Sequence, residues 1–394
     1  MCGSIRPLKS KLLLMKNKPD FMKRFKKLKF FLFASGLLVF LVISRSCEMP
    51  ATGFKEVEEG GYIEKDQKAE ALIPDSSIVV MTWNIRYGFG RGPWFGDACG
   101  YKVIYSEEEI LANLELIAAR IRQVNPDILL LQEADINSSR SAYVNELRWL
   151  LDKTDFNYAV FGLQWKAQFV PSDGLGRIEE TNAILSRWKL KDAKRFQLDR
   201  RQDQIAIERY FYERYCMLEA TVEIPGYKDL VLLNIHASAF ATDDTKFKNL
   251  KEFKEELDIM SESGKFFVAG GDLNTLPPGS DKTDYCIEDM CPGESFHQQG
   301  NDPMHKIGCD YTPEKEWIVS LYDSYQSVIT PGQYLSNQEA YFTHTTRPGH
   351  FWDRTLDYLF TNNRWRSGAS FVRQDFTLES DHAPVGGELI LKRN

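Results

Sequence analysis

Short, almost wholly apolar runs dominate this chain, and they restrict its fold more than any other feature. Four of these runs read SIVVMTWN, DILLLQEAD, DLVLLNIH and KFFVAGGD. Their β-branched residues and their lack of alternation predict strands that are buried on both faces. Further strands are predicted at 158–164, 181–187, 215–224, 355–361, 370–376 and 383–391.

Two amphipathic helices are predicted among these strands. The first, over 106–126, begins with a capping box of Ser106 and Glu109, and the second, over 243–264, ends at Gly264. The second helix has Phe247, Leu250, Phe253 and Leu257 on one face. Helices interspersed among buried and alternating strands predict mixed sheets covered by helices. The economical interpretation is one domain over residues 76–394.

The N-terminal segment, residues 1–47, is typical of a targeting sequence. Residues 1–46 carry a charge of +10, and Phe30–Ser44 is an uncharged run of 15 residues. A full membrane span needs about 20 apolar residues, so the run fits a signal-peptide core better. The basic residues precede it, which predicts that the rest of the chain lies outside the cytoplasm. A lipoprotein acceptor at Cys47, an uncleaved membrane anchor and a cleaved signal peptide all remain open.

Two further segments stand out by composition. Residues 48–75 are polar, charged and poor in aromatic side chains, which predicts a flexible tether. Residues 279–315 contain three cysteines, which predicts an insertion closed by a disulfide in an exported protein. A zinc site that uses His297 or His305 is the alternative for this insertion.

The charge of the chain bears on its partners. The net charge is −7, so the part that follows the basic segment carries −17. A body this acidic is poorly suited to tight binding of nucleic acid unless a metal assists. No obligate protein partner is predicted.

Polar residues that can bind a metal or a phosphate recur where the apolar runs end. Taken singly, each is typical of an ordinary turn or of a solvated loop. Together they predict one site at the ends of neighbouring strands. The residues are Asn84, Glu133, His236, Asp272, Asn274, Asp357, Asp381 and His382.

The order of these residues resembles the endonuclease/exonuclease/phosphatase superfamily, which includes deoxyribonucleases, abasic-site endonucleases, neutral sphingomyelinases and inositol-polyphosphate phosphatases. The likeness rests on TWNIRYG, LLLQEAD, TNAILSR, LNIHASAF, GGDLNTLP, LDYLF and SDHAPV. It spans Thr82–Val385, nearly the whole body. The resemblance implies an α/β fold, a four-layer α/β/β/α sandwich of two packed mixed sheets flanked by helices.

The resemblance also implies a metal site. Glu133 would bind Mg²⁺, or Mn²⁺ or Ca²⁺ in its place, as a hard carboxylate binds a hard ion. Asn84 would hold that carboxylate or the water shell of the metal. Asp381 would complete the acidic cluster, with a second metal as its ligand partner in a two-metal site, while Asn274 would donate a hydrogen bond to a phosphate oxygen.

The remaining roles concern protons. Asp272 would orient or deprotonate the attacking water, and His382 would protonate or position the reacting phosphate. Asp357 would fix the tautomer of His382 and raise its pKa. His236 would be a second histidine in contact with the phosphate.

Two departures limit the likeness to particular subgroups. Arg354 stands three residues before Asp357, where many members have an arginine two before, so its contact with phosphate stays open. No tyrosine matches the one that abasic-site enzymes use. The sequence predicts a divalent-metal-dependent hydrolase, preferably of phosphodiesters. Its substrate is a lipid head group or a nucleic acid, and a non-catalytic binding module is the remote third alternative.

Overall fold

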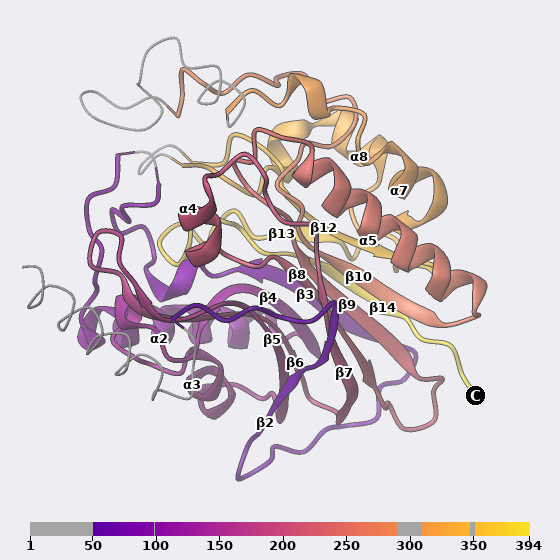
Figure 1. Ribbon diagram of the computed structural model, residues 1–394. Helices are drawn as coiled ribbons and strands as arrows, with labels where there is room; N and C mark the ends of the chain where they lie inside the picture. The colour runs from indigo at the N-terminus through magenta and orange to yellow at the C-terminus, as the bar shows by residue number, and fades with distance from the viewer. Residues whose placement is uncertain (1–49, 98, 290–308, 347–350) are drawn as a thin grey trace, which may run out of the picture. The chain divides into compact units, whose positions relative to one another are not determined.

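The computed structural model describes residues 50–97, 99–289, 309–346 and 351–394 (Figure 1). The predicted targeting segment, residues 1–47, therefore lies outside the described residues. Two seven-stranded sheets form the centre of the fold. In spatial order, sheet A contains β13 (Phe371–Val372), β14 (Val385–Ile390), β3 (Ser77–Asn84), β4 (Ile128–Asp135), β6 (Gly176–Ser186), β5 (Tyr158–Val170) and β2 (Gly61–Glu64). Sheet B contains β1 (Val57–Glu59), β7 (Leu190–Gln197), β8 (Cys216–Val222), β9 (Leu230–His236), β10 (Phe266–Asp272), β12 (Asp357–Thr361) and β11 (Gln326–Ser327).

Helices cover the outer faces of both sheets (Figure 1). Helices α2 (Glu107–Val124) and α3 (Glu146–Lys153) pack on sheet A, and α5 (Thr245–Glu262) packs on sheet B. The shorter helices are α4 (Ala206–Phe211), α7 (Val319–Ser324) and α8 (Pro331–Ser336). The four-layer α/β/β/α sandwich is thus confirmed.

Both predicted helices are present, each beginning and ending one or two residues inside the predicted range, and one side chain predicted to lie on the apolar face is exposed. The capping box is present in α2, because the Ser106 side chain accepts from the Glu109 amide and the Glu109 side chain accepts from the Ser106 amide. In α5, Leu250, Phe253 and Leu257 are buried as predicted. Phe247 is 42% exposed and packs against the Trp317 ring with centroids 5.4 Å apart, so its assignment to the apolar face was wrong.

The apolar side chains divide into layers that match the sheets and helices. Val80, Leu130 and Leu232 are fully buried where the inner faces of the two sheets meet. A second cluster lies between sheet A and its helices, and a third lies between sheet B and α5. Because strands such as β3 and β4 face a buried layer on both sides, their near-continuous apolar sequences follow directly.

The pairing of strands sets the topology of the site. Strand β10 pairs in parallel with β9 and antiparallel with β12. A Cβ atom at Gly271, where φ is +139°, would lie 1.9 Å from the backbone oxygen of Ile235 in β9. A glycine is therefore required here for β10 to approach β9 closely. In sheet A, the late strand β14 pairs with the early strand β3, with Val385 opposite Thr82.

The predicted tether over 48–75 is wrong for part of its length. Strand β1 pairs with β7 at one edge of sheet B, and β2 pairs with β5 at one edge of sheet A. Each of these edge strands buries little side-chain area, and Val57 is 46% exposed. Edge strands are held mainly by backbone hydrogen bonds, so their polar composition resembles that of a linker.

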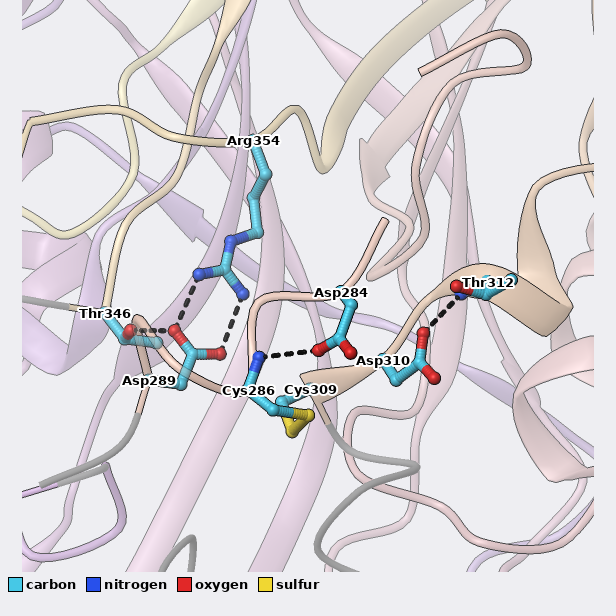
Figure 2. Close-up of a disulfide and its surroundings, with 8 residues drawn as sticks. All are labelled: Asp284, Cys286, Asp289, Cys309, Asp310, Thr312, Thr346 and Arg354. Atoms are coloured by element: carbon cyan, nitrogen blue, oxygen red, sulfur yellow. Dashed lines mark hydrogen bonds and ion pairs between the residues drawn. A yellow bond between two sulfur atoms is a disulfide. The ribbon is translucent and has the colours of Figure 1, made fainter. Parts of the chain in front are cut away.

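The cysteine-containing insertion is partly described. Cys286 and Cys309 form a disulfide (Figure 2). These two sulfur atoms cannot act as zinc thiolates while they are bonded to each other, which removes them from the alternative zinc site. His297, His305 and Cys291 lie outside the described residues. Cys216 is a buried free thiol.

Among the residues that the structure describes, no helix combines the length and the apolar character needed to cross a bilayer.

Candidate active site

Three predicted site residues stand side by side on neighbouring strands of sheet B. Asp272, the last residue of β10, is the register partner of His236 at the end of β9 and of Asp357 at the start of β12. All three side chains are buried. The mixed pairing of β10 therefore brings together residues that are far apart in the sequence.

Sheet A supplies two more residues from the facing layer. The Nδ2 atom of Asn84 donates to Glu133 Oε1 at 3.0 Å and to Asp272 Oδ2 at 3.2 Å. Glu133 has a φ of +55° and lies where the register of β4 and β6 shifts between Leu131 and Ala134. A bulge of this kind re-aims a side chain, and here it accompanies a carboxylate that lines the cleft. Asn84 links the carboxylates of the two sheets.

His382 forms a tight pair with Asp357. Its Nδ1 lies 2.8 Å from Asp357 Oδ2, and its Nε2 lies 3.5 Å from Asp272 Oδ2. Burial disfavours the charged imidazolium, but Asp357 and Asp272 outweigh this effect and raise the pKa of His382 to about 10. The ring is therefore protonated at neutral pH and can donate from Nε2.

His236 is held in the opposite protonation state. Burial lowers the pKa of His236 to about 4, against the attraction of Asp272. The amide nitrogen of Gln164 lies 3.1 Å from His236 Nδ1. The same Gln164 nitrogen donates to Glu180 at 2.8 Å, so it is a donor toward His236 as well. His236 Nδ1 consequently accepts, so Nε2 carries the proton. That atom is 3.7 Å from both Glu133 Oε1 and Asp272 Oδ2.

The carboxylates of the site fit a divalent cation. Burial and the neighbouring Asp381 raise the pKa of Glu133 to about 7, and burial also raises the pKa of Asp272. These pKa shifts indicate that several carboxylates lie close together away from solvent, and a bound cation would reduce the repulsion between them. Carboxylate oxygens are also the ligands that Mg²⁺ prefers.

Asn84, Asp381 and Asn274 also lie at this site, and each has a hydrogen-bond or ion-pair partner in the protein. The Asn84 oxygen accepts from the Arg86 amide at 3.0 Å, which favours its role in holding Glu133 over direct metal binding. Asp381 Oδ2 is 3.1 Å from Arg86 Nε. Asn274 lines the cleft and donates from Nδ2 to the Ala237 carbonyl at 3.0 Å, which leaves its second N–H for a ligand.

Arg354 is engaged by protein carboxylates. Its guanidinium is 1% exposed and donates to both oxygens of Asp289, at 2.9 and 2.6 Å. Asp353 accepts a second pair of hydrogen bonds from Arg354. Figure 2 shows Arg354 and Thr346 both directed at the Asp289 carboxylate, to which the Thr346 hydroxyl donates. Asp289 follows Cys286 in the disulfide-closed insertion, so the insertion supplies the anion that this arginine binds.

Sequence reasoning missed His344. Its ring lies 4.4 Å from that of His382, centroid to centroid, and its buried Nδ1 has no hydrogen-bond partner among the residues that the structure describes. Ligand atoms of His344, Asp381 and His382 lie within 4.8 Å of one another, as do those of Asp272, Asp357 and His382. His344 follows no apolar run, so the strand-end pattern could not reveal it.

All eight predicted residues except Asn84 and Asp357 line a single cleft of about 290 Å³. Asn84 lies behind Glu133, and Asp357 lies behind His382. The other lining residues divide into two groups. One group is polar, and the other is aromatic and comes from several segments: Tyr87, Trp94, Phe95, Trp165, Tyr212, Tyr215, Phe240 and Tyr311.

Comparison with known proteins identifies the family. The family model described as Endonuclease/Exonuclease/phosphatase family matches residues 81–382, which is most of the chain. The chain belongs to this family. Members are hydrolytic phosphoesterases that depend on divalent metals, and the protein is accordingly a metal-dependent phosphoesterase.

The chain is similar to solved structures of the endonuclease/exonuclease/phosphatase family, the first of which shares its fold. A member from Beutenbergia cavernae is 21% identical with a TM-score of 0.53, covering 80% of this chain and 72% of its own. The human Nocturnin catalytic domain with bound sulfate is 16% identical, with a TM-score of 0.44, and covers 84% of this chain and 97% of its own. TDP2 from C. elegans is 15% identical, with a TM-score of 0.43 and coverages of 80% and 77%. No curated protein matches the chain.

Proposed function

We propose that this protein is a phosphodiesterase that works outside the cytoplasm and uses Mg²⁺, or Mn²⁺ or Ca²⁺ in its place. The observation that carries the proposal is the row His236, Asp272 and Asp357 on adjacent strands, with His382 bonded to Asp357 at 2.8 Å. This arrangement provides a carboxylate base beside one neutral and one protonated histidine. Such a set suits attack of water on a phosphorus atom and stabilisation of the negative charge that develops.

Each side chain can be given one task. Asp272 accepts the proton of the attacking water, because its Oδ2 lies 3.5 Å from Nε2 of His382 and 3.7 Å from Nε2 of His236. His382 donates from Nε2 to a phosphate oxygen, and Asp357 keeps its Nδ1 protonated. His236 donates from Nε2 to a second oxygen.

The metal would be held by Glu133, with Asp381 as a second carboxylate that lines the same cleft. A bound divalent ion would neutralise the phosphate and stabilise charge in an in-line displacement. Asn84 fixes the orientation of Glu133 through the 3.0 Å bond described above.

Location outside the cytoplasm rests on the N-terminal sequence. The basic stretch followed by 15 uncharged residues supports export, with membrane attachment through residues 1–47 or through lipidation of Cys47 as two forms of the same proposal. The Cys286–Cys309 disulfide is consistent with an oxidising compartment.

The test is an assay of purified protein, stripped of metal and then supplied with Mg²⁺, Mn²⁺ or Ca²⁺. Bis(p-nitrophenyl) phosphate reports on diester hydrolysis, and p-nitrophenyl phosphate reports on monoester hydrolysis. We expect metal-dependent release of nitrophenol from the diester in preference to the monoester. Turnover of the monoester alone would refute the diester assignment, and turnover without added metal would refute the metal role.

A nuclease is the second candidate, and one observation bears on it. Residues 200–214 are rich in arginine and could have made the cleft locally basic. Their guanidinium groups instead bind Asp203, the Gln202 side-chain oxygen or backbone carbonyls, and none of these arginines lines the cleft. The structure therefore offers little support for a nucleic-acid groove among the described residues.

A further inference from the structure

His344 lines the same cleft as Asp381 and His382 but takes no part in the chemistry described above. Its side chain is 8% exposed, and its Nδ1 has no hydrogen-bond partner among the residues that the structure describes. An unpartnered polar atom in a buried place destabilises the fold, and a bound ligand or ion can supply the missing contact. A phenylalanine ring would fill the same space without this cost, so packing alone does not explain an imidazole here.

Backbone pairing fixes the position of the His344 ring. The His344 amide donates to the Arg354 carbonyl at 2.9 Å, and the His344 carbonyl accepts from the Asp353 amide at 3.0 Å. The next amide, that of Thr345, donates to the Asp381 carbonyl at 3.2 Å. The backbone of His344 is therefore held beside that of Asp381, which limits how far the two side chains can move apart.

The side chains of His344 and Asp381 form a pair of metal-ligating groups. Their ligand atoms lie within 4.8 Å of each other and of a His382 nitrogen. Two ligands of one ion are at most about 4 Å apart, so a shift of less than about 1 Å would bring both side chains onto the same cation. His382 is not counted as a ligand, because its Nδ1 is bonded to Asp357 and its Nε2 is assigned to the phosphate.

Asp381 keeps the capacity to bind a cation beside its arginine. Arg86 Nε lies 3.1 Å from Asp381 Oδ2, and Oδ1 accepts a long bond of 3.3 Å from the Ser380 hydroxyl. A carboxylate has about four lone-pair sites, so these two contacts leave sites for a metal. Glu133, the other carboxylate of the proposed metal site, lines the same cleft. The cleft therefore offers oxygen and nitrogen ligands together.

A nitrogen ligand changes which cation such a cleft prefers. Mg²⁺ and Ca²⁺ are hard ions that take oxygen ligands, so they gain little from an imidazole. First-row transition metals bind nitrogen and oxygen ligands in the same site. Of the three ions considered above, only Mn²⁺ belongs to this class. An imidazole placed beside carboxylates therefore favours Mn²⁺ over Mg²⁺.

We propose that His344 is a metal ligand, which binds a divalent transition-metal ion together with Asp381 and Glu133 and makes the cleft prefer Mn²⁺ to Mg²⁺. The inference rests on the proposed metal site and names the class of ion that this site holds. It gives the buried imidazole a partner and explains why a histidine, rather than a wholly apolar ring, packs against His382.

The experiment measures metal binding to the full chain without turnover. Mn²⁺ binding is followed by electron paramagnetic resonance (EPR), Mg²⁺ binding is followed by competition with Mn²⁺, and pulsed EPR detects a nitrogen nucleus bound to Mn²⁺. His344→Phe keeps a ring against His382 but removes both nitrogens. It should weaken Mn²⁺ binding by roughly 10-fold or more and Mg²⁺ binding by less than about 2-fold, and it should abolish the nitrogen signal. Tyr311→Phe, which changes another residue that lines the cleft, should leave both affinities and the signal unchanged.

A second variant covers the case in which His344→Phe does not fold. His344→Gln offers an amide oxygen in place of the ring nitrogens, so it should also lower the ratio of Mn²⁺ to Mg²⁺ affinity and remove the nitrogen signal. Urea unfolding of each metal-free variant shows whether it is folded.

Three results would overturn the proposal. These are a wild type that binds Mg²⁺ as tightly as Mn²⁺, bound Mn²⁺ without a nitrogen signal, and an affinity ratio that is unchanged in the folded variants. Absence of any Mn²⁺ binding to the wild type would overturn both the ligand and the metal site. If bis(p-nitrophenyl) phosphate is not hydrolysed but the nitrogen signal depends on His344, the phosphodiesterase assignment fails while the ligand stands. Hydrolysis of that diester with an unchanged affinity ratio overturns only the ligand.

Discussion

Replacing Asp289 by Asn should destabilise the fold far more than removing a typical surface charge. Asp289 accepts from both terminal nitrogens of Arg354, and the two side chains are 3% and 1% exposed. Removing one partner of a buried pair leaves a desolvated charge and costs about 3–5 kcal/mol. Asp353 retains two bonds to the same guanidinium, so we expect the lower end, about 3 kcal/mol.

The matched control is Asp375→Asn. Asp375 binds Arg373 with comparable geometry, at 2.8 and 2.7 Å, but its side chain is 53% exposed. Exposed pairs contribute about 0–1 kcal/mol, so this variant should unfold within about 0.5 kcal/mol of the wild type. Urea unfolding followed by far-UV circular dichroism measures both. A loss below about 1 kcal/mol for Asp289→Asn would contradict the reasoning, because it would equal the cost expected of a solvated pair.

Three other perturbations test the site and the sheets. Glu133→Gln should reduce metal-dependent diester turnover by at least about 100-fold, which is the scale of one lost electrostatic contact. Its thermal unfolding should stay cooperative, and near-normal turnover would refute the role of Glu133 as a metal ligand. In the wild type, the raised pKa of His382 adds stability that is fully present below the ordinary histidine pKa and is lost as pH rises through about 10. Asp357→Asn should therefore move the alkaline limb of the kcat/KM–pH profile to lower pH, and an unmoved limb would show that another group controls it. Gly271→Ala should lower the free energy of unfolding by about 3 kcal/mol or more, because its Cβ would meet the Ile235 oxygen; a Tm within 2–3 °C of the wild type would contradict this.

Local sequence patterns predicted the buried strands and the residues at their ends. β3, β4, β9 and β10 are covered on both faces, so their sequences are apolar throughout and end visibly at a polar residue. Strands at or near sheet edges carry no such signal. β7, with the sequence LKDAKRFQ, was not predicted, and β1 with β2 was taken for a tether.

Contacts between distant segments could not be predicted from the sequence. The ring of His344 packs against that of His382 at a tilt, and Asp289 pairs with Arg354, yet neither His344 nor Asp289 belongs to a local pattern. Glu213 faces the cleft because α4 and the turn after it fold toward Trp165, whose Nε1 donates to the Phe211 carbonyl at 2.7 Å. Positions of this kind depend on tertiary packing, which periodicity does not encode.

The pairing of β3 with β14 affects how the chain can be made. Thr82 of β3 is opposite Val385 of β14. β3 is therefore synthesised about 300 residues before its partner strand. His382, just before β14, arrives equally late. A chain that stops a few residues short of 385 thus leaves the edge of β3 unpaired, and it lacks the β14 strand that follows His382. The nascent protein is consequently prone to self-association until β14 has been made, and chains terminated before β14 should be inactive and insoluble rather than partly active.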